Sequence, residues 1–113
     1  MNLKTVENSE HYIWGNNCDG WHLLKTNSLS VIQEKMPSNT SETLHFHKDA
    51  QQFFYILRGI ATFEIEGELF EVKEKQGFHI IPNQRHRILN NTENDLEFIV
   101  ISEPKSHGDR VNI

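Results

Sequence analysis

Residues 45–72 read HFHKDAQQFFYILRGIATFEIEGELFEV, and this stretch decides the fold class. From Ala61 to Glu66, apolar residues mostly alternate with polar ones, and the alternation resumes after Gly67 and Glu68 in the run from Leu69 to Val72. A period of two on both sides of a glycine is typical of two antiparallel strands joined by a tight turn. The stretch therefore predicts a β-hairpin.

Outward from this hairpin, the chain from Leu23 onward consists of short runs of β-branched, aromatic and aliphatic residues separated by turn-forming residues. The runs 53–57 and 96–101 are apolar nearly throughout, which indicates strands covered on both faces, inside a sandwich or at a subunit contact. Only residues 5–10 favour a helix, of one or two turns. About ten such strands predict an all-β double-sheet jelly-roll barrel.

A chain of 113 residues fits one domain, 1–113. We expect the barrel over roughly residues 23–103, an N-terminal arm over 1–22 and a C-terminal tail over 104–113. Residues 104–110 carry His, Asp and Arg, and fit either a lid over the barrel mouth or a polar tail, which we favour. The large residues Tyr12, Ile13, Trp14 and Trp21 are expected to pack against a partner subunit or to cover the barrel end.

Charge and composition exclude several classes of function. The net charge is −5, with 16 acidic and 11 scattered basic residues, so we expect no nucleic-acid partner. No apolar run approaches the ~18 residues of a membrane helix, and residues 1–10 lack the apolar core of a signal peptide, which predicts a cytoplasmic protein without membrane contact. Cys18 is the only cysteine, which excludes an intrachain disulfide, and we expect a loop thiol there.

Histidines are unevenly placed in the sequence. His45 and His47 are two residues apart on a predicted strand, so their side chains point to the same face and Phe46 points to the other. Gln52 begins the next apolar strand, and His86 lies in a separate strand-like segment. The four side chains could therefore meet inside a barrel.

The spacing of these residues resembles the first cupin motif, H-x-H-x(3,4)-E-x(6)-G, with His45, His47, Gln52 and Gly59 at its positions. Gln52 stands where the motif has glutamate. The second cupin motif is also similar, with Pro82, His86 and Asn90 at its proline, histidine and asparagine. In that motif Gln84 takes the place of the inner glycine and Gln76 that of the first, with Gly77 one place later. The resemblance covers residues 29–101.

The resemblance implies one divalent metal ion held by His45, His47, Gln52 and His86. Gln51 also fits the shorter form of the spacing, but the distance to Gly59 and strand alternation favour Gln52. A neutral amide in place of a carboxylate leaves the ion its full double charge and makes it a stronger Lewis acid. Imidazole ligands accept several metals; zinc, nickel and iron rank first, and manganese or copper would also fit. An empty cupin with hydrogen-bonded histidines is the alternative.

Acid–base chemistry beside the metal would need a proton carrier. Glu34 is preferred, because cupins often place pocket residues on the strand 29–36. His79 either lines the barrel or lies on its outer face. Phe54 and Ile56 share the face of Gln52 and are expected to wall the substrate pocket. The full set of candidate proton carriers is Glu34, Glu42, His79, Tyr55 and His22.

The resemblance favours a metal-dependent isomerase or lyase acting on a small oxygen-rich molecule, such as a sugar acid or keto acid. Small cupins with three histidines and a glutamine include proteins resembling the uronate ring-opening enzymes of pectin breakdown. A non-catalytic module that binds a sugar or another small molecule is the main alternative, and a metal-dependent dioxygenase is a third. Cupins are often dimers, so we expect a homodimer.

Overall fold

The computed structural model describes residues 2–113. Within them lie twelve β-strands and one short 3-10 helix, η1 (Val6–Asn8), where the sequence predicted helical turns. The strands are β1 (Glu10–Trp14), β2 (Cys18–Lys25), β3 (Ser30–Met36), β4 (Thr40–Ser41), β5 (His45–His47), β6 (Gln51–Arg58), β7 (Ala61–Ile65), β8 (Glu68–Val72), β9 (Gly77–Ile80), β10 (His86–Asn90), β11 (Leu96–Glu103) and β12 (Arg110–Asn112).

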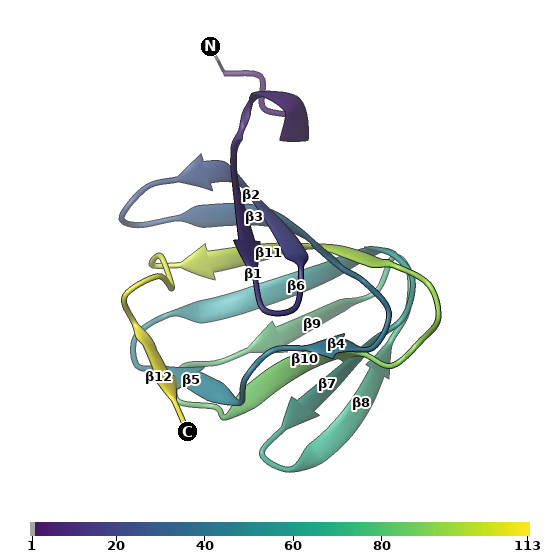
Figure 1. Ribbon diagram of the computed structural model, residues 1–113. Helices are drawn as coiled ribbons and strands as arrows, with labels where there is room; N and C mark the ends of the chain where they lie inside the picture. The colour runs from purple at the N-terminus through teal and green to yellow at the C-terminus, as the bar shows by residue number, and fades with distance from the viewer. Residues whose placement is uncertain (1) are drawn as a thin grey trace.

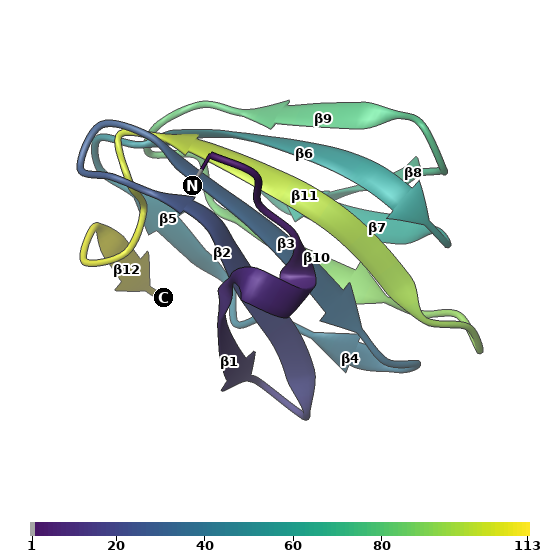
Figure 2. The same cartoon turned by 90° about the horizontal axis from the view of Figure 1, so that it is seen from above.

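The strands form two antiparallel sheets that pack into a barrel (Figure 1). One sheet has the order β1-β2-β3-β11-β6-β9, and the other has the order β12-β5-β10-β7-β8, with β4 paired to β10. Figure 2 shows the C-terminal strand β12 lying beside β5 at one end of the barrel. The predicted all-β jelly roll is confirmed. Among residues 2–113, no helix has the length and apolar character needed to cross a membrane.

The predicted hairpin is formed by β7 and β8. Ile65 pairs with Glu68, and the two residues between them, Glu66 and Gly67, have φ angles of 49° and 85°. Two successive left-handed residues make the two-residue turn whose twist matches that of antiparallel strands. The inward residues of β7, Ala61, Phe63 and Ile65, are buried in the core, as the alternation predicted.

Aromatic side chains from both sheets fill the core between them. Phe63 of β7 stacks on Phe78 of β9 with ring centroids 4.9 Å apart, and it meets Phe54 of β6 edge-on at 5.1 Å. Phe98 of β11 is fully buried beside Phe54. This packing fixes β6 and β11 against the second sheet and thereby sets the position of residues farther along β6.

Of the two alternatives for the runs 53–57 and 96–101, burial of both faces inside the barrel is not observed, whereas cover by a second subunit stays a prediction. Every second residue of β6 faces outward, and Phe53, Tyr55 and Leu57 are 40%, 39% and 42% exposed. Ile101 on the neighbouring β11 is 37% exposed. Strand alternation places one apolar set in the core and leaves a second set on the outer face of the sheet.

The N-terminal segment is part of the first sheet. β1 pairs with β2 and β2 pairs with β3, so the expected barrel boundary at residue 23 falls inside β2. Cys18 was expected in a loop, but it is the first residue of β2 and is fully buried among core residues. Burial raises the pKa of its thiol. The N-terminal segment thus contributes to the core.

Asn90 ties the end of β10 to two other segments, the end of β3 and the loop that follows β10. Its side chain is fully buried, and Nδ2 shares its hydrogens among the carbonyl oxygens of Met36, Pro37 and Asn94 at 2.9, 3.2 and 2.8 Å. We expect Asn90→Ala to lower the free energy of unfolding by about 3 kcal/mol, because buried carbonyls lose their donors. Urea unfolding measures the loss. The exposed neighbour substitution Asn91→Ala is the control, and equal losses would contradict the assigned role.

The exposed apolar residues of β6 and β11 are suited to a subunit contact, and we propose that they form the interface of the homodimer expected from the sequence. Tyr55→Lys combined with Leu57→Lys should convert a dimer into a monomer, because two charges would be desolvated in the contact. Light scattering after size-exclusion chromatography measures the mass. Leu69→Lys, at a residue 67% exposed on the hairpin, is the control. A monomeric wild type would overturn the proposal.

Candidate metal centre and cavity

Three histidines from two strands meet inside the barrel. Alternation along β5 turns His45 and His47 to the interior, and His86 at the start of β10 pairs directly with His45. One nitrogen from each ring lies within 4.8 Å of the corresponding nitrogens of the other two. All three side chains are buried, with exposed fractions of 1% to 5%. The tertiary structure thus brings together the three predicted histidines in a group that could hold one metal ion.

Backbone carbonyls orient two of the rings. His45 Nδ1 lies 2.7 Å from the carbonyl oxygen of Thr43, and His86 Nδ1 lies 2.8 Å from that of Gln84. A carbonyl can only accept a hydrogen bond, so Nδ1 carries the proton and Nε2 keeps its lone pair. His86 Nε2 is buried without a hydrogen-bond partner. A buried polar atom without a partner is uncommon, and the lone pair of this nitrogen could bind a metal ion.

Burial keeps the histidines neutral. Desolvation, with the nearby His86 as the second cause, lowers the pKa of His45 to about 3 and that of His47 to about 4. Desolvation also lowers the pKa of His86. Neutral imidazole is the form that binds metals. At neutral pH each of the three rings therefore keeps one nitrogen lone pair that could bind a metal ion.

Gln52 is buried near the start of β6 and lines the same cavity, whereas Gln51 is exposed on the outer face. The Gln52 amide nitrogen donates to Ser102 Oγ at 3.0 Å, and Ser102 lies 3.4 Å from Ser106 Oγ. Gln52 Oε1 is buried and has no hydrogen-bond partner within residues 2–113. The three imidazole nitrogens could hold a divalent transition metal, and the amide oxygen of Gln52 stays the predicted fourth ligand.

His45, His47 and Gln52 border a cavity of about 400 Å³. Apolar side chains form one part of its wall, and acidic and basic side chains form another. This combination suits a small molecule with an apolar side and a polar end. Besides His45, His47 and Gln52, the lining residues are Tyr12, Trp14, Ile32, Glu34, Glu42, Phe54, Val100, Ser106, His107, Gly108 and Arg110.

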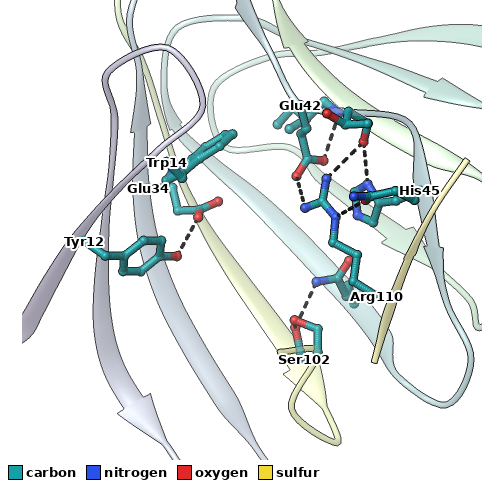
Figure 3. A network of polar contacts seen from close by, with 12 residues as sticks. Tyr12, Trp14, Glu34, Glu42, His45, Ser102 and Arg110 are labelled. Carbon is teal, nitrogen blue, oxygen red and sulfur yellow. Dashed lines mark hydrogen bonds and ion pairs between the residues drawn. The ribbon is translucent and has the colours of Figure 1, made fainter. Parts of the chain in front are cut away.

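Glu34 projects into this cavity from β3, on the wall formed with β1 (Figure 3). Its Oε2 accepts a hydrogen bond of 2.8 Å from the Tyr12 hydroxyl. Desolvation and, secondly, the negative charge of Glu42 raise the pKa of Glu34 to about 8. A carboxyl group that titrates near neutral pH can both accept and donate a proton.

Glu42 and Arg110 lie on the other side, near His45 (Figure 3). Arg110 Nη1 is 3.7 Å from Glu42 Oε2, Nη2 donates to the carbonyl oxygen of Thr43 at 3.2 Å, and Nε donates to Asn112 Oδ1 at 2.8 Å. Desolvation raises the pKa of Glu42 to about 7, although Arg110 opposes the shift. Arg110 is thus a cation at the rim, held beside the histidine cluster.

Several predicted positions differ from those in the structure. Phe54 lines the cavity, but Ile56 is fully buried in the core and does not reach it. His79 is exposed on the outer face of β9, where Nε2 lies 2.9 Å from Gln51 Oε1, so the outer-face alternative holds and His79 does not reach the cavity as a proton carrier. Tyr55 also faces outward. His22 lies outside the cavity lining, with its ring 4.9 Å from that of Tyr12.

The C-terminal segment was interpreted as a polar tail, and this interpretation is wrong. Ser106, His107, Gly108 and Arg110 line the cavity, and β12 pairs with the strand that carries His45 and His47. Asp109 Oδ2 accepts hydrogen bonds of 2.9 Å from the backbone nitrogens of residues 49 and 50. The cluster of His, Asp and Arg in residues 104–110 was the available signal, but the sequence could not show which strand they join.

The second motif also needs a correction. The turn before β10 is made by Asn83, which has a φ of 68° in the left-handed region that favours glycine. Gln84 is not among the residues with positive φ. Asn83 stands three residues before His86, so it takes the place of the motif's inner glycine, and asparagine tolerates this conformation better than most residues.

Comparisons with known proteins agree with this architecture. An uncharacterised protein of Methanocaldococcus jannaschii is 31% identical over 81 residues, which are 71% of this chain and 65% of that protein, so the match spans less than two thirds of its length. The polyketide cyclase RemF of Streptomyces resistomycificus superposes with a TM-score of 0.86 at 15% identity, over 100% of this chain and 85% of RemF.

Two further solved structures share the fold. A predicted oxalate decarboxylase of Thermotoga maritima has a TM-score of 0.83 at 21% identity, covering 91% of this chain and 99% of its own. KdgF of a Halomonas species has a TM-score of 0.82 at 18% identity, over 91% and 93% of the two chains. Residues 32–102 match the family described as Cupin domain. This chain is a member of the cupin domain family.

Proposed function

We propose that this cupin is a metal-dependent enzyme of the isomerase or lyase type, acting on a small anionic, oxygen-rich molecule such as a sugar acid or keto acid. The observation that carries the proposal is the donor set at the cavity wall. Within residues 2–113, His86 Nε2 and Gln52 Oε1 are buried without hydrogen-bond partners, and His86 lies beside the neutral imidazoles of His45 and His47. Leaving such atoms unpaired is unfavourable, and a bound cation would satisfy them.

A divalent ion bound by neutral ligands would polarise a carbonyl or carboxylate oxygen of the substrate. Zinc, nickel and iron suit three imidazoles and an amide best, and manganese or copper would also bind. The chain's own contribution to ligand geometry is visible in the carbonyl oxygens of Thr43 and Gln84, which orient His45 and His86. Such outer partners fix ring orientation and raise ligand basicity.

Two charged side chains support the choice of substrate and reaction. Arg110 places a guanidinium at the rim of the cavity, where it favours an anionic substrate group. Glu34 lies on the β1–β3 wall of the same cavity and is the proposed proton carrier, able to take a proton from a carbon beside a carbonyl and return it elsewhere. Phe54, Ile32 and Val100 give the bound molecule an apolar side.

Known proteins of this shape carry different chemistries. Those compared above include a polyketide cyclase and a predicted oxalate decarboxylase. Because a shared barrel does not fix the reaction, these activities support only the general idea of small-molecule chemistry in the cavity. The choice between reaction types therefore rests on Glu34, Arg110 and the donor set of this chain.

Metal binding should stabilise the folded protein. We expect the free energy of unfolding to rise by about 2.7 kcal/mol when free zinc or nickel is about 100-fold above Kd. Calorimetry measures the rise as a higher Tm when metal is added to chelator-treated protein. His45→Ala combined with His86→Ala should abolish the gain and leave less than a tenth of an equivalent of metal by elemental analysis. His11→Ala combined with His79→Ala, at two exposed positions, is the control. Equal metal content in both double variants would contradict the site.

Proton transfer by Glu34 can be measured without knowing the natural product. Metal-loaded protein is incubated anaerobically with small 2-keto acids and unsaturated uronates in D2O, and proton NMR records deuterium entering beside the carbonyl. Glu34→Gln should slow exchange at least about 100-fold, because the amide cannot carry a proton. The control is Glu71→Gln, on the exposed face of β8.

Each outcome of the exchange experiment decides between functions. Exchange in the wild type and the control but not in Glu34→Gln supports the proposed enzyme. Ligand binding by calorimetry without exchange would replace it with a non-catalytic binding module. Oxygen consumption by the iron-loaded protein with the same compounds would replace it with a dioxygenase.

A further inference from the structure

Tyr12, Gly20 and Glu34 lie side by side across three strands of the first sheet. Tyr12 of β1 pairs in register with Gly20 of β2, and Gly20 pairs with Glu34 of β3. Neighbouring strands are about 4.8 Å apart, so Tyr12 and Glu34 are separated by the full width of β2. Their side chains nevertheless make a hydrogen bond of 2.8 Å.

Gly20 makes this contact possible. A Cβ atom at Gly20 would lie 2.6 Å from both Oη and Cε1 of Tyr12, far inside van der Waals distance. The phenol ring of Tyr12 therefore packs on the backbone of Gly20 in β2, and its hydroxyl reaches the carboxylate of Glu34 on β3. Any other residue at position 20 would push the ring away from Glu34.

The hydroxyl is well placed to hold Glu34. Among residues 2–113, Tyr12 is the one hydrogen-bond donor to the Glu34 side chain. The charged and titratable groups that face this pair are Glu42, which lies before β5, and Arg110 of β12, with His22 and His107 packed against the Tyr12 ring. Burial raises the pKa of the phenol, so the hydroxyl keeps its proton and remains a donor.

We propose that Tyr12 is a positioning residue for Glu34: its hydroxyl, placed by Gly20, holds the carboxylate in one orientation toward the cavity and stabilises its ionised form. The catalytic consequence rests on the proposed function of Glu34, whereas the hydrogen bond itself can be tested without substrate or metal. A purely structural tyrosine would affect stability and leave the protonation of Glu34 unchanged.

The test follows the Glu34 carboxyl carbon by NMR in protein labelled with ¹³C at glutamate, with the signal assigned by its loss in Glu34→Gln. Tyr12→Phe keeps the ring and removes the donor. A hydrogen bond to the ionised form lowers the pKa of a carboxyl group. Removing the bond from Tyr12 should therefore move the midpoint of the Glu34 titration upward by about one pH unit. Gly20→Ala should produce the same upward shift by displacing the ring.

Two controls on the same sheet match these variants. Tyr55→Phe removes a phenol hydroxyl on the outer face of β6. Gly77→Ala introduces a methyl group beneath an aromatic ring on the outer face, because a Cβ there would overlap Phe53 as one at Gly20 overlaps Tyr12. Both controls should leave the Glu34 midpoint where it is in the wild type.

If folded Tyr12→Phe titrated at Glu34 with the wild-type midpoint, the proposal would be overturned. A shift of this midpoint in Gly20→Ala alone would also overturn it, because the Tyr12 hydroxyl would then not be the cause. If the Glu34 midpoint moves as expected, the rate of deuterium exchange measured against pH tests separately whether Glu34 transfers a proton to the substrate. If the acidic limb of this pH–rate profile moves to higher pH together with the Glu34 midpoint, the result supports a role for Glu34 in proton transfer. Absence of exchange in every protein would refute the proposed function and leave the Tyr12–Glu34 pairing standing.

Discussion

The pairing of His45 with His86 across β5 and β10 is the contact on which the site depends. It joins the two motifs of the chain at one point of the second sheet, with ring centroids 4.3 Å apart. Rings this close inside a barrel cannot all be charged, because desolvation and mutual repulsion both oppose protonation. Carbonyl groups at Thr43 and Gln84 then select the tautomer. Sheet register thus brings the rings together, burial keeps them neutral, and the backbone carbonyls orient two of them.

The C-terminal residues hold this arrangement from outside. β5 has three residues, which is short for an independent strand, and β12 pairs with all three. Asp109 fixes the loop that follows β5, and Ser106 extends the polar chain from Gln52 through Ser102. The last ten residues therefore support both histidines of β5 and the amide of Gln52. The donor set is built from the two motifs and stabilised by residues far outside them.

The first sheet supplies Gln52 and, on its β1–β3 side, an acidic and aromatic part of the cavity wall. Its N-terminal hairpin adds Tyr12 and Trp14 to the cavity, and β3 adds the acidic Glu34, which lies on the opposite wall from Arg110 and His45 (Figure 3). The hairpin can do this because Gly20 lets an aromatic ring cross β2. The lack of a side chain at Gly20 thus leaves room for the Tyr12 ring beside the cavity.

The sequence by itself determined the barrel, the hairpin at Gly67 and the facing of His45, His47 and Gln52, because alternation and turn residues act over a few positions. It also separated Gln52 from Gln51, since neighbours on a strand point to opposite faces. Only the tertiary structure decided that Arg110 and Tyr12 reach the cavity, that Ile56 belongs to the core and that His79 faces outward. These outcomes depend on which distant strands pair and on the depth of each side chain. Strand pairing and side-chain burial are set by the packing of the whole chain, and local sequence patterns do not determine them.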